Sequence, residues 1–156
     1  MPGVFTVATH RRFHLLGNIL HFHKFSHETN GTYCLVEARV APGAGAPPNR
    51  HPGEEEAFVV LEGQFEFLLG DRTVRVTGGD SVTIPSGAVH AFTNVGDTPG
   101  RLMIFNAPGA VHDAFFAGLG DPVDAGSWDF PASDGPPDIP ALIAAAKQTG
   151  VEIVAG

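Results

Sequence analysis

Three residues in the middle of the chain have the types and the spacing of divalent-metal ligands: His51, Glu56 and His90. His51 stands directly before a Pro-Gly pair that predicts a tight turn, and Glu56 opens the strand-like run that follows. His90 follows a second predicted turn at the start of its own strand-like run. Two neutral imidazoles and one carboxylate form the facial set that suits non-haem Fe(II) and also accepts Mn, Co, Ni or Zn. The sequence therefore predicts a metal site, provided that the strands carrying these residues enclose one cavity.

The elements around these residues read as short strands separated by turns. The chain has 156 residues, and its 20 glycines and 13 prolines are spread at short intervals. From Phe13 to about Phe105 apolar runs alternate with turn residues, which indicates about seven short strands without helices between them. This pattern predicts an all-β sandwich, barrel or jelly roll. We expect one domain over residues 1–156, with the barrel core over about 13–106.

The last third of the chain predicts a helical tail over about residues 111–156. Apolar residues recur every four positions from Val111 to Leu119. Asp138 then stands at the N-cap position of a second helix, which Gly150 would end. Two helices packed on the outside of the barrel are expected.

Composition excludes several classes of partner. The net charge is −8, and no basic cluster is larger than Arg11-Arg12, so a nucleic-acid ligand is not expected. No apolar run approaches the ~20 residues that span a membrane, and the N-terminus lacks the order of a signal peptide. We expect a cytoplasmic protein with a small-molecule ligand. Cys34 is the only cysteine, so no intrachain disulfide can form, and its strand-like surroundings predict a buried thiol.

The segment around His51 resembles the first sequence motif of the cupin superfamily. That motif is glycine, five residues, His, one residue, His, three or four residues, Glu, six residues and glycine. Gly43, His51, Glu56 and Gly63 fit its positions, but Asn49 stands where the family has its first His. The resemblance implies metal positions at residues 49, 51 and 56. Because an amide oxygen is a poorer donor than imidazole, Asn49 should weaken metal affinity or leave a coordination position open.

The segment around His90 resembles the second cupin motif, which is glycine, five residues, Pro, one residue, Gly, two residues, His, three residues and Asn. All five positions are filled, by Gly79, Pro85, Gly87, His90 and Asn94. The chain also resembles single-domain bacterial cupins of the quercetin dioxygenase-like group. The resemblance implies a cupin double-stranded β-helix, a jelly-roll barrel, with a short C-terminal helical extension. It also implies a metal site of Asn49, His51, Glu56 and His90.

Neighbouring residues of the same types receive other interpretations. The motif spacing selects Glu56 from three successive glutamates, and Glu54 and Glu55 read as a solvated turn. His21 and His23 share one face of a strand, where one could supply a fourth ligand or both could be partly exposed. His27 and His112 read as surface residues. Five phenylalanines are assigned to the core: Phe58, Phe65, Phe67, Phe92 and Phe105.

The function that the resemblance implies is a metal-dependent, dioxygenase-like enzyme for a small aromatic or enolisable molecule. Glu56 would act as general base beside the metal. The alternatives are a non-catalytic module that binds or senses a metal or small molecule, and a cupin isomerase or lyase. A homodimer is expected, with the apolar stretch from Phe13 to Phe25 as its contact.

Overall fold

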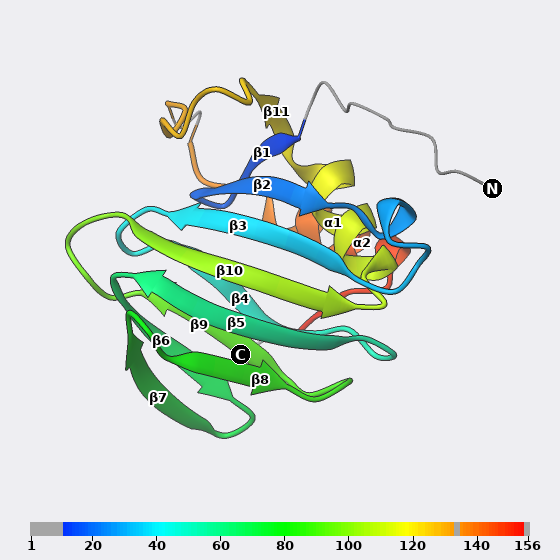
Figure 1. Ribbon diagram of the computed structural model, residues 1–156, viewed down its shortest axis with the longest axis horizontal. Coiled ribbons are helices and arrows are strands. Elements are labelled where there is room, and N and C mark those ends of the chain that lie inside the picture. Colours follow the sequence, from blue (N-terminus) through cyan, green and yellow to red (C-terminus); the bar gives the residue numbers. More distant parts are fainter. Residues whose placement is uncertain (1–10, 133–134, 155–156) are drawn as a thin grey trace.

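The computed structural model describes residues 11–132 and 135–154, and its strands form two antiparallel sheets (Figure 1). In spatial order, the seven-stranded sheet consists of β11 (Asp121–Val123), β1 (Arg12–Leu15), β2 (Asn18–Lys24), β3 (Cys34–Val40), β10 (Gly100–Ala107), β5 (Glu55–Glu62) and β8 (Ser81–Ile84). The five-stranded sheet consists of β12 (Glu152–Ile153), β4 (Gly45–Arg50), β9 (His90–Asn94), β6 (Gln64–Leu69) and β7 (Arg72–Thr77). The prediction of an all-β barrel with a C-terminal helical extension is confirmed.

The core lies between the sheets because their strands alternate buried and exposed side chains. In β3, for example, every second residue from Cys34 to Val40 is fully buried. Four of the five phenylalanines assigned to the core are buried: Phe58, Phe65, Phe67 and Phe92. The assignment of Phe105 was wrong. Its position in β10 faces outward, where the residue is 39% exposed and its ring stacks on Tyr33 at 5.4 Å between centroids.

The tail contains the two predicted helices and two strands that the sequence did not predict. Helix α1 runs over Ala110–Leu119 and α2 over Ile139–Thr149, where Asp138 accepts a hydrogen bond from the Ala141 amide at 3.1 Å as N-cap. The added strands are β11, which pairs with β1, and β12, which pairs with β4. Strands of two or three residues show no periodicity of their own, so only their partners define them. In the described part of the chain, no helix has the length and apolarity to cross a membrane.

The stretch from Phe13 to Phe25 forms β1, β2 and the chain leading to a short 3₁₀ helix, η1 (Ser26–Glu28). Most of its apolar side chains pack inside this same chain: Phe13, Ile19, Leu20 and Phe22 are buried. The outer edge of β1 is covered by β11. A dimer contact over this stretch would therefore rest largely on polar side chains, and the homodimer stays a prediction.

Candidate metal centre

The three predicted ligands come from both sheets and meet at one end of the space between them. His51 follows β4 directly and precedes the Pro52-Gly53 turn, in which Gly53 has a φ of 83°. His90 begins β9, which pairs with β4 in the five-stranded sheet. Glu56 belongs to β5 in the seven-stranded sheet. The two motifs thus place their imidazoles opposite a carboxylate of the other sheet.

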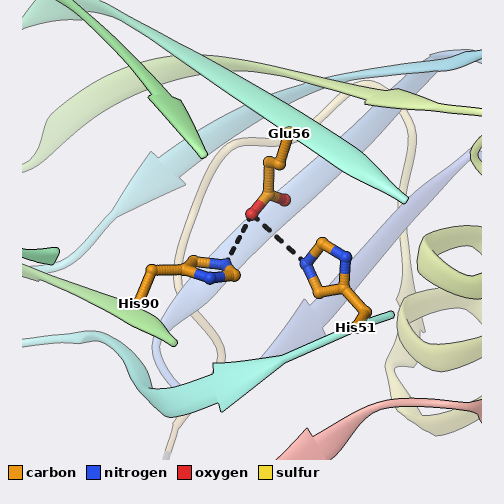
Figure 2. Close-up of side chains that lie close together, drawn as sticks. All are labelled: His51, Glu56 and His90. Carbon is orange, nitrogen blue, oxygen red and sulfur yellow. Dashed lines mark ion pairs between the residues drawn. The ribbon is translucent and has the colours of Figure 1, made fainter. Parts of the chain in front are cut away.

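The side chains of His51, Glu56 and His90 point toward one another (Figure 2). Glu56 Oε1 lies 2.7 Å from His90 Nε2 and 3.4 Å from His51 Nε2. One donor atom from each residue lies within 4.8 Å of the other two, and all three residues are buried. Ligands at right angles around an ion with 2.0–2.1 Å bonds are about 3 Å apart, so the set fits a divalent ion such as those of the facial triad.

The outer nitrogens of both imidazoles determine which tautomer faces the centre. His90 Nδ1 lies 2.9 Å from the Ala88 carbonyl, which can only accept, so Nδ1 carries a proton and Nε2 is the nitrogen that could bind a metal. His51 Nδ1 faces Glu54 Oε1 at 3.7 Å, which is too long for a hydrogen bond but places negative charge beside that nitrogen. Both Nε2 atoms are therefore oriented as metal ligands.

The charges in the cluster shift the pKa values of Glu56 and His51 in opposite directions. Burial alone would raise the pKa of Glu56, but hydrogen bonds from His51 and His90 and the nearby imidazole of His112 outweigh it and hold the pKa below its usual range. Burial lowers the pKa of His51, whereas the contact with Glu56 and the charge of Glu54 raise it, and the net shift is upward. The carboxylate and the His51 imidazole thus favour each other's charged forms, and a divalent ion would compete with protons for the imidazole nitrogens.

Asn49 belongs to β4 and pairs with His90 of β9. Both residues line one cavity. The amide nitrogen of Asn49 donates to the carbonyls of Pro47 at 2.8 Å and His90 at 3.3 Å. Because carbonyls only accept, these contacts define which end of the amide is the nitrogen, and Oδ1 is the only atom left to bind a metal. Its role as a ligand stays a prediction.

Helix α1 brings a further imidazole to the cluster. His112 is buried, with Nδ1 3.5 Å from Glu56 Oε2 and its ring centroid 6.4 Å from that of His51. Burial, the largest effect, lowers the pKa of His112 to about 4, so the imidazole is neutral at pH 7. The interpretation of His112 as a surface residue was wrong. A signal was available, because His112 shares one helical face with Phe115, Phe116 and Leu119 at spacings of three, four and seven.

Glu54 is the second residue whose role the sequence did not reveal. It is only 1% exposed, and its Oε2 accepts hydrogen bonds from the amides of Gly109 at 3.0 Å and Val111 at 3.2 Å. These amides belong to the first turn of α1 and the residue before it, where the helix offers unpaired donors. The interpretation of Glu54 as solvated was therefore wrong, whereas Glu55 is exposed as expected.

The other histidines considered as a fourth ligand lie away from the centre. His21 and His23 alternate with the buried Leu20 and Phe22 along β2, so they face outward. His23 forms an ion pair with Glu37 at 3.0 Å. The interpretation of both as partly exposed strand residues is confirmed, as is that of His27 at the surface.

A narrow and largely apolar cavity opens at the cluster. His51, Glu56, His90 and His112 line it, together with Asn18 and Asn49. Its apolar wall comes from the barrel, from α1 and from the segment after α2; the side chains include Leu15, Leu20, Phe58, Phe92, Ile104, Phe115, Phe116, Val151 and Ile153.

Comparison with known families agrees with this geometry. Residues 36–106 match the family model described as cupin domain, and these residues contain both ligand-bearing segments. This part of the chain is therefore similar to a cupin domain.

Known relatives have varied descriptions. The chain is 44% identical over 74 residues to germin-like protein subfamily T member 3 of Arabidopsis thaliana, covering 44% of this chain and 33% of that protein. It is 32% identical over 80 residues to polyketide synthase CurC of Streptomyces cyaneus, covering 51% of each chain. The chain spans less than two thirds of the first curated relatives that it matches. Among solved structures, the polyketide cyclase RemF of Streptomyces resistomycificus has a TM-score of 0.57 at 22% identity, over 68% of this chain and 80% of that chain, which shows a shared fold.

Proposed function

We propose that this protein is a metal-dependent, dioxygenase-like enzyme that acts on a small aromatic or enolisable molecule. One observation carries the proposal: the donors of His51, Glu56 and His90 converge at the wall of an apolar cavity. A structural metal site is closed by protein ligands on all sides, whereas a catalytic site keeps positions open. Three convergent donors beside a cavity correspond to the second kind.

The chain's own residues would bind and orient such a substrate. Phe58 and Phe92 line the cavity near the cluster, and an aromatic ring packed on them would direct its oxygen toward His51 and His90. A divalent ion held by His51, Glu56 and His90 would act as a Lewis acid on an enol or phenol oxygen. The apolar wall would limit the access of bulk water.

Glu56 is the residue that would accept the substrate proton. Its contacts with imidazoles keep its pKa low, so the carboxylate is in its acceptor form throughout the neutral range. Oε1 faces the two ligand imidazoles, and Oε2 faces His112. A proton taken from an O–H or an activated C–H group would therefore arrive at a carboxylate with imidazoles on both sides.

The relatives support a substrate of this kind. CurC is described as a polyketide synthase. Polyketide chains contain dicarbonyl units that enolise and cyclise to phenols, which matches a site that combines an apolar wall with an oxygen-binding metal. A cupin isomerase or lyase would use the same residues on a related substrate, and a non-catalytic binding module would use them without turnover.

Reconstitution and oxygen uptake test this proposal. The protein is loaded separately with Fe(II), Mn(II), Co(II) or Ni(II) and mixed with a panel of phenols and 1,3-diketones, while an oxygen electrode and mass spectrometry follow the reaction. We expect at least one metal form to consume oxygen with at least one compound. Conversion without oxygen uptake would replace the dioxygenase-like reaction by isomerisation or cleavage. Binding without any product from any metal form would favour the binding module.

Glu56→Gln provides the matching variant because it removes the charge and keeps the shape. We expect kcat to fall by about 10²- to 10⁴-fold, the contribution of a general base, in protein whose metal content is unchanged by elemental analysis. Glu55→Gln is the control, since Glu55 is the exposed neighbour in the same run of glutamates. An unchanged kcat in metal-loaded Glu56→Gln would rule out the carboxylate as the base.

A further inference from the structure

Helix α1 places one imidazole where the barrel strands leave a gap in the ligand set. Asn49 stands where the first cupin motif has its first His, and its amide nitrogen donates hydrogen bonds to two backbone carbonyls. His112 reaches the cluster from a separate element and faces Glu56 Oε2 through Nδ1 at 3.5 Å. Glu56 thus has imidazoles on both of its oxygens, with His51 and His90 on one and His112 on the other.

The burial of His112 calls for a partner beyond the residues now in contact with it. The side chain is buried against Phe116, with ring centroids 4.3 Å apart. Its Nε2 has no hydrogen-bond partner among the described residues. An imidazole buried among aromatic rings loses its hydration, and a metal bond at Nδ1, the nitrogen that faces Glu56, would compensate for part of that loss.

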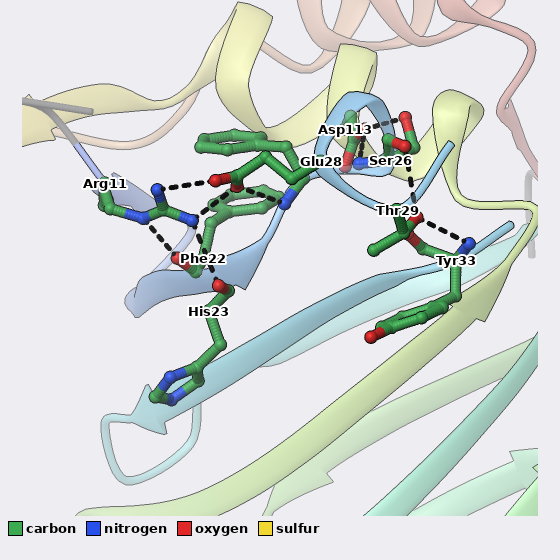
Figure 3. A network of polar contacts seen from close by, with 9 residues as sticks. Arg11, Phe22, His23, Ser26, Glu28, Thr29, Tyr33 and Asp113 are labelled. Atoms are coloured by element: carbon green, nitrogen blue, oxygen red, sulfur yellow. Dashed lines mark hydrogen bonds and ion pairs between the residues drawn. The ribbon is translucent and has the colours of Figure 1, made fainter. Parts of the chain in front are cut away.

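Two anchors hold α1 so that His112 stays at the cluster. Glu54 binds the amides of Gly109 and Val111 just before and just after the helix start. On the other side of His112, Asp113 Oδ2 accepts hydrogen bonds from the Ser26 amide at 2.7 Å and from the Ser26 hydroxyl (Figure 3). Ser26 belongs to η1, so the helix is attached both to the segment that carries the ligands and to the end of β2.

We propose that His112 is the fourth protein ligand of the metal centre, so that helix α1 supplies the imidazole that strand β4 lacks at Asn49. This inference rests on the metal centre of the proposed function. Glu56 Oε1 lies 2.7 Å from His90 and 3.4 Å from His51, and Glu56 Oε2 lies 3.5 Å from His112, all near the ~3 Å expected between adjacent ligands. The group of donor atoms within 4.8 Å of one another contains His51, Glu56 and His90 without His112, so His112 must move toward an ion beside Glu56 to bind it.

The number of bound imidazoles tests the inference directly. Wild-type protein and His112→Gln are each loaded with one equivalent of Cu(II), and pulsed electron paramagnetic resonance counts the coordinated imidazoles. We expect three in the wild type and two in His112→Gln. His27→Gln, which removes an exposed histidine, is the control and should retain three. The double variant Asn49→His/His112→Gln should return the number to three.

Affinity is a second readout but does not decide the question alone. We expect His112→Gln to weaken Mn(II) or Ni(II) binding by about 10- to 100-fold in titration calorimetry, which loss of a residue that only orients a ligand can also produce. The imidazole number separates the two roles. If His112→Gln does not fold, His112→Phe gives the same comparison, because a benzyl ring keeps the aromatic packing against Phe116.

Each outcome decides between the two proposals. Two imidazoles in the wild type, or three in both the wild type and His112→Gln, would overturn the role of His112 and leave the metal centre of the proposed function intact. Absence of stoichiometric binding by any of the metals would remove the metal centre itself, and both proposals with it.

Discussion

The barrel and the tail contribute to one site in different ways. The barrel supplies His51, Glu56 and His90 from strands and turns that short-range sequence patterns predict. The tail supplies His112, together with the cavity residues of α1 and the segment after α2, through contacts between segments more than 50 positions apart. The barrel therefore supplies the three converging donor groups, and the tail forms part of the cavity wall around them. Variants that affect only one region can test this division.

The largest effect is expected from a ligand of the barrel. His90→Ala should abolish stoichiometric metal binding, because only His51 and Glu56 of the barrel set would remain and Glu56 would lose its closest imidazole. Elemental analysis after gel filtration measures it. The control is His23→Ala, which removes an exposed imidazole on the outer face of β2. Full occupancy in His90→Ala would mean that the tail, and not the barrel, dominates metal binding.

A smaller effect is expected at the junction between the two regions. Glu54→Ala removes the acceptor of two amides at the start of α1, and we expect the free energy of unfolding to fall by about 2–3 kcal/mol. Urea denaturation in the presence of a chelator measures this in the metal-free protein. Glu55→Ala, at the exposed neighbour, should change stability by no more than about 0.5 kcal/mol. Equal effects of both variants would show that Glu54 does not hold the helix.

The smallest effect is expected at η1, the short helix whose Ser26 binds Asp113 of α1. Arg11 bonds Glu28 at 2.6 Å and, as the largest cause, lowers the pKa of Glu28 from 4.5 to about 2 (Figure 3). A lowered folded-state pKa contributes stability that is complete above about pH 4.5 and is lost as the pH falls through about 2. Wild type should therefore exceed Glu28→Gln in unfolding free energy at neutral pH, and the difference should shrink across this acidic range. A difference that does not change with pH would exclude the ion pair as its source.

The sequence predicted the barrel and the convergence of His51, Glu56 and His90 because both depend on short-range patterns. Alternation of apolar residues predicts strands, and the Pro-Gly turn before Glu56 sets the strand that carries it. Glu54 and Glu56 are two positions apart in the same run of glutamates, yet one binds a helix and the other faces imidazoles. Their difference depends on where α1 lies, which no pattern near residue 54 contains. His112 was missed for the same reason, although the helical face that it shares with Phe115 was visible in the sequence.

Glu54 would couple the docking of α1 to metal binding at the proposed centre. One of its oxygens holds the first turn of α1, and the other faces the outer nitrogen of His51, a proposed ligand, at 3.7 Å. Any free energy that the docked helix adds to metal binding must be returned by the metal to the docking of the helix, because linkage is reciprocal. Metal occupancy and the docking of α1 would then form one thermodynamic cycle. Protection of the α1 amides from hydrogen exchange would then report how much of the protein is loaded.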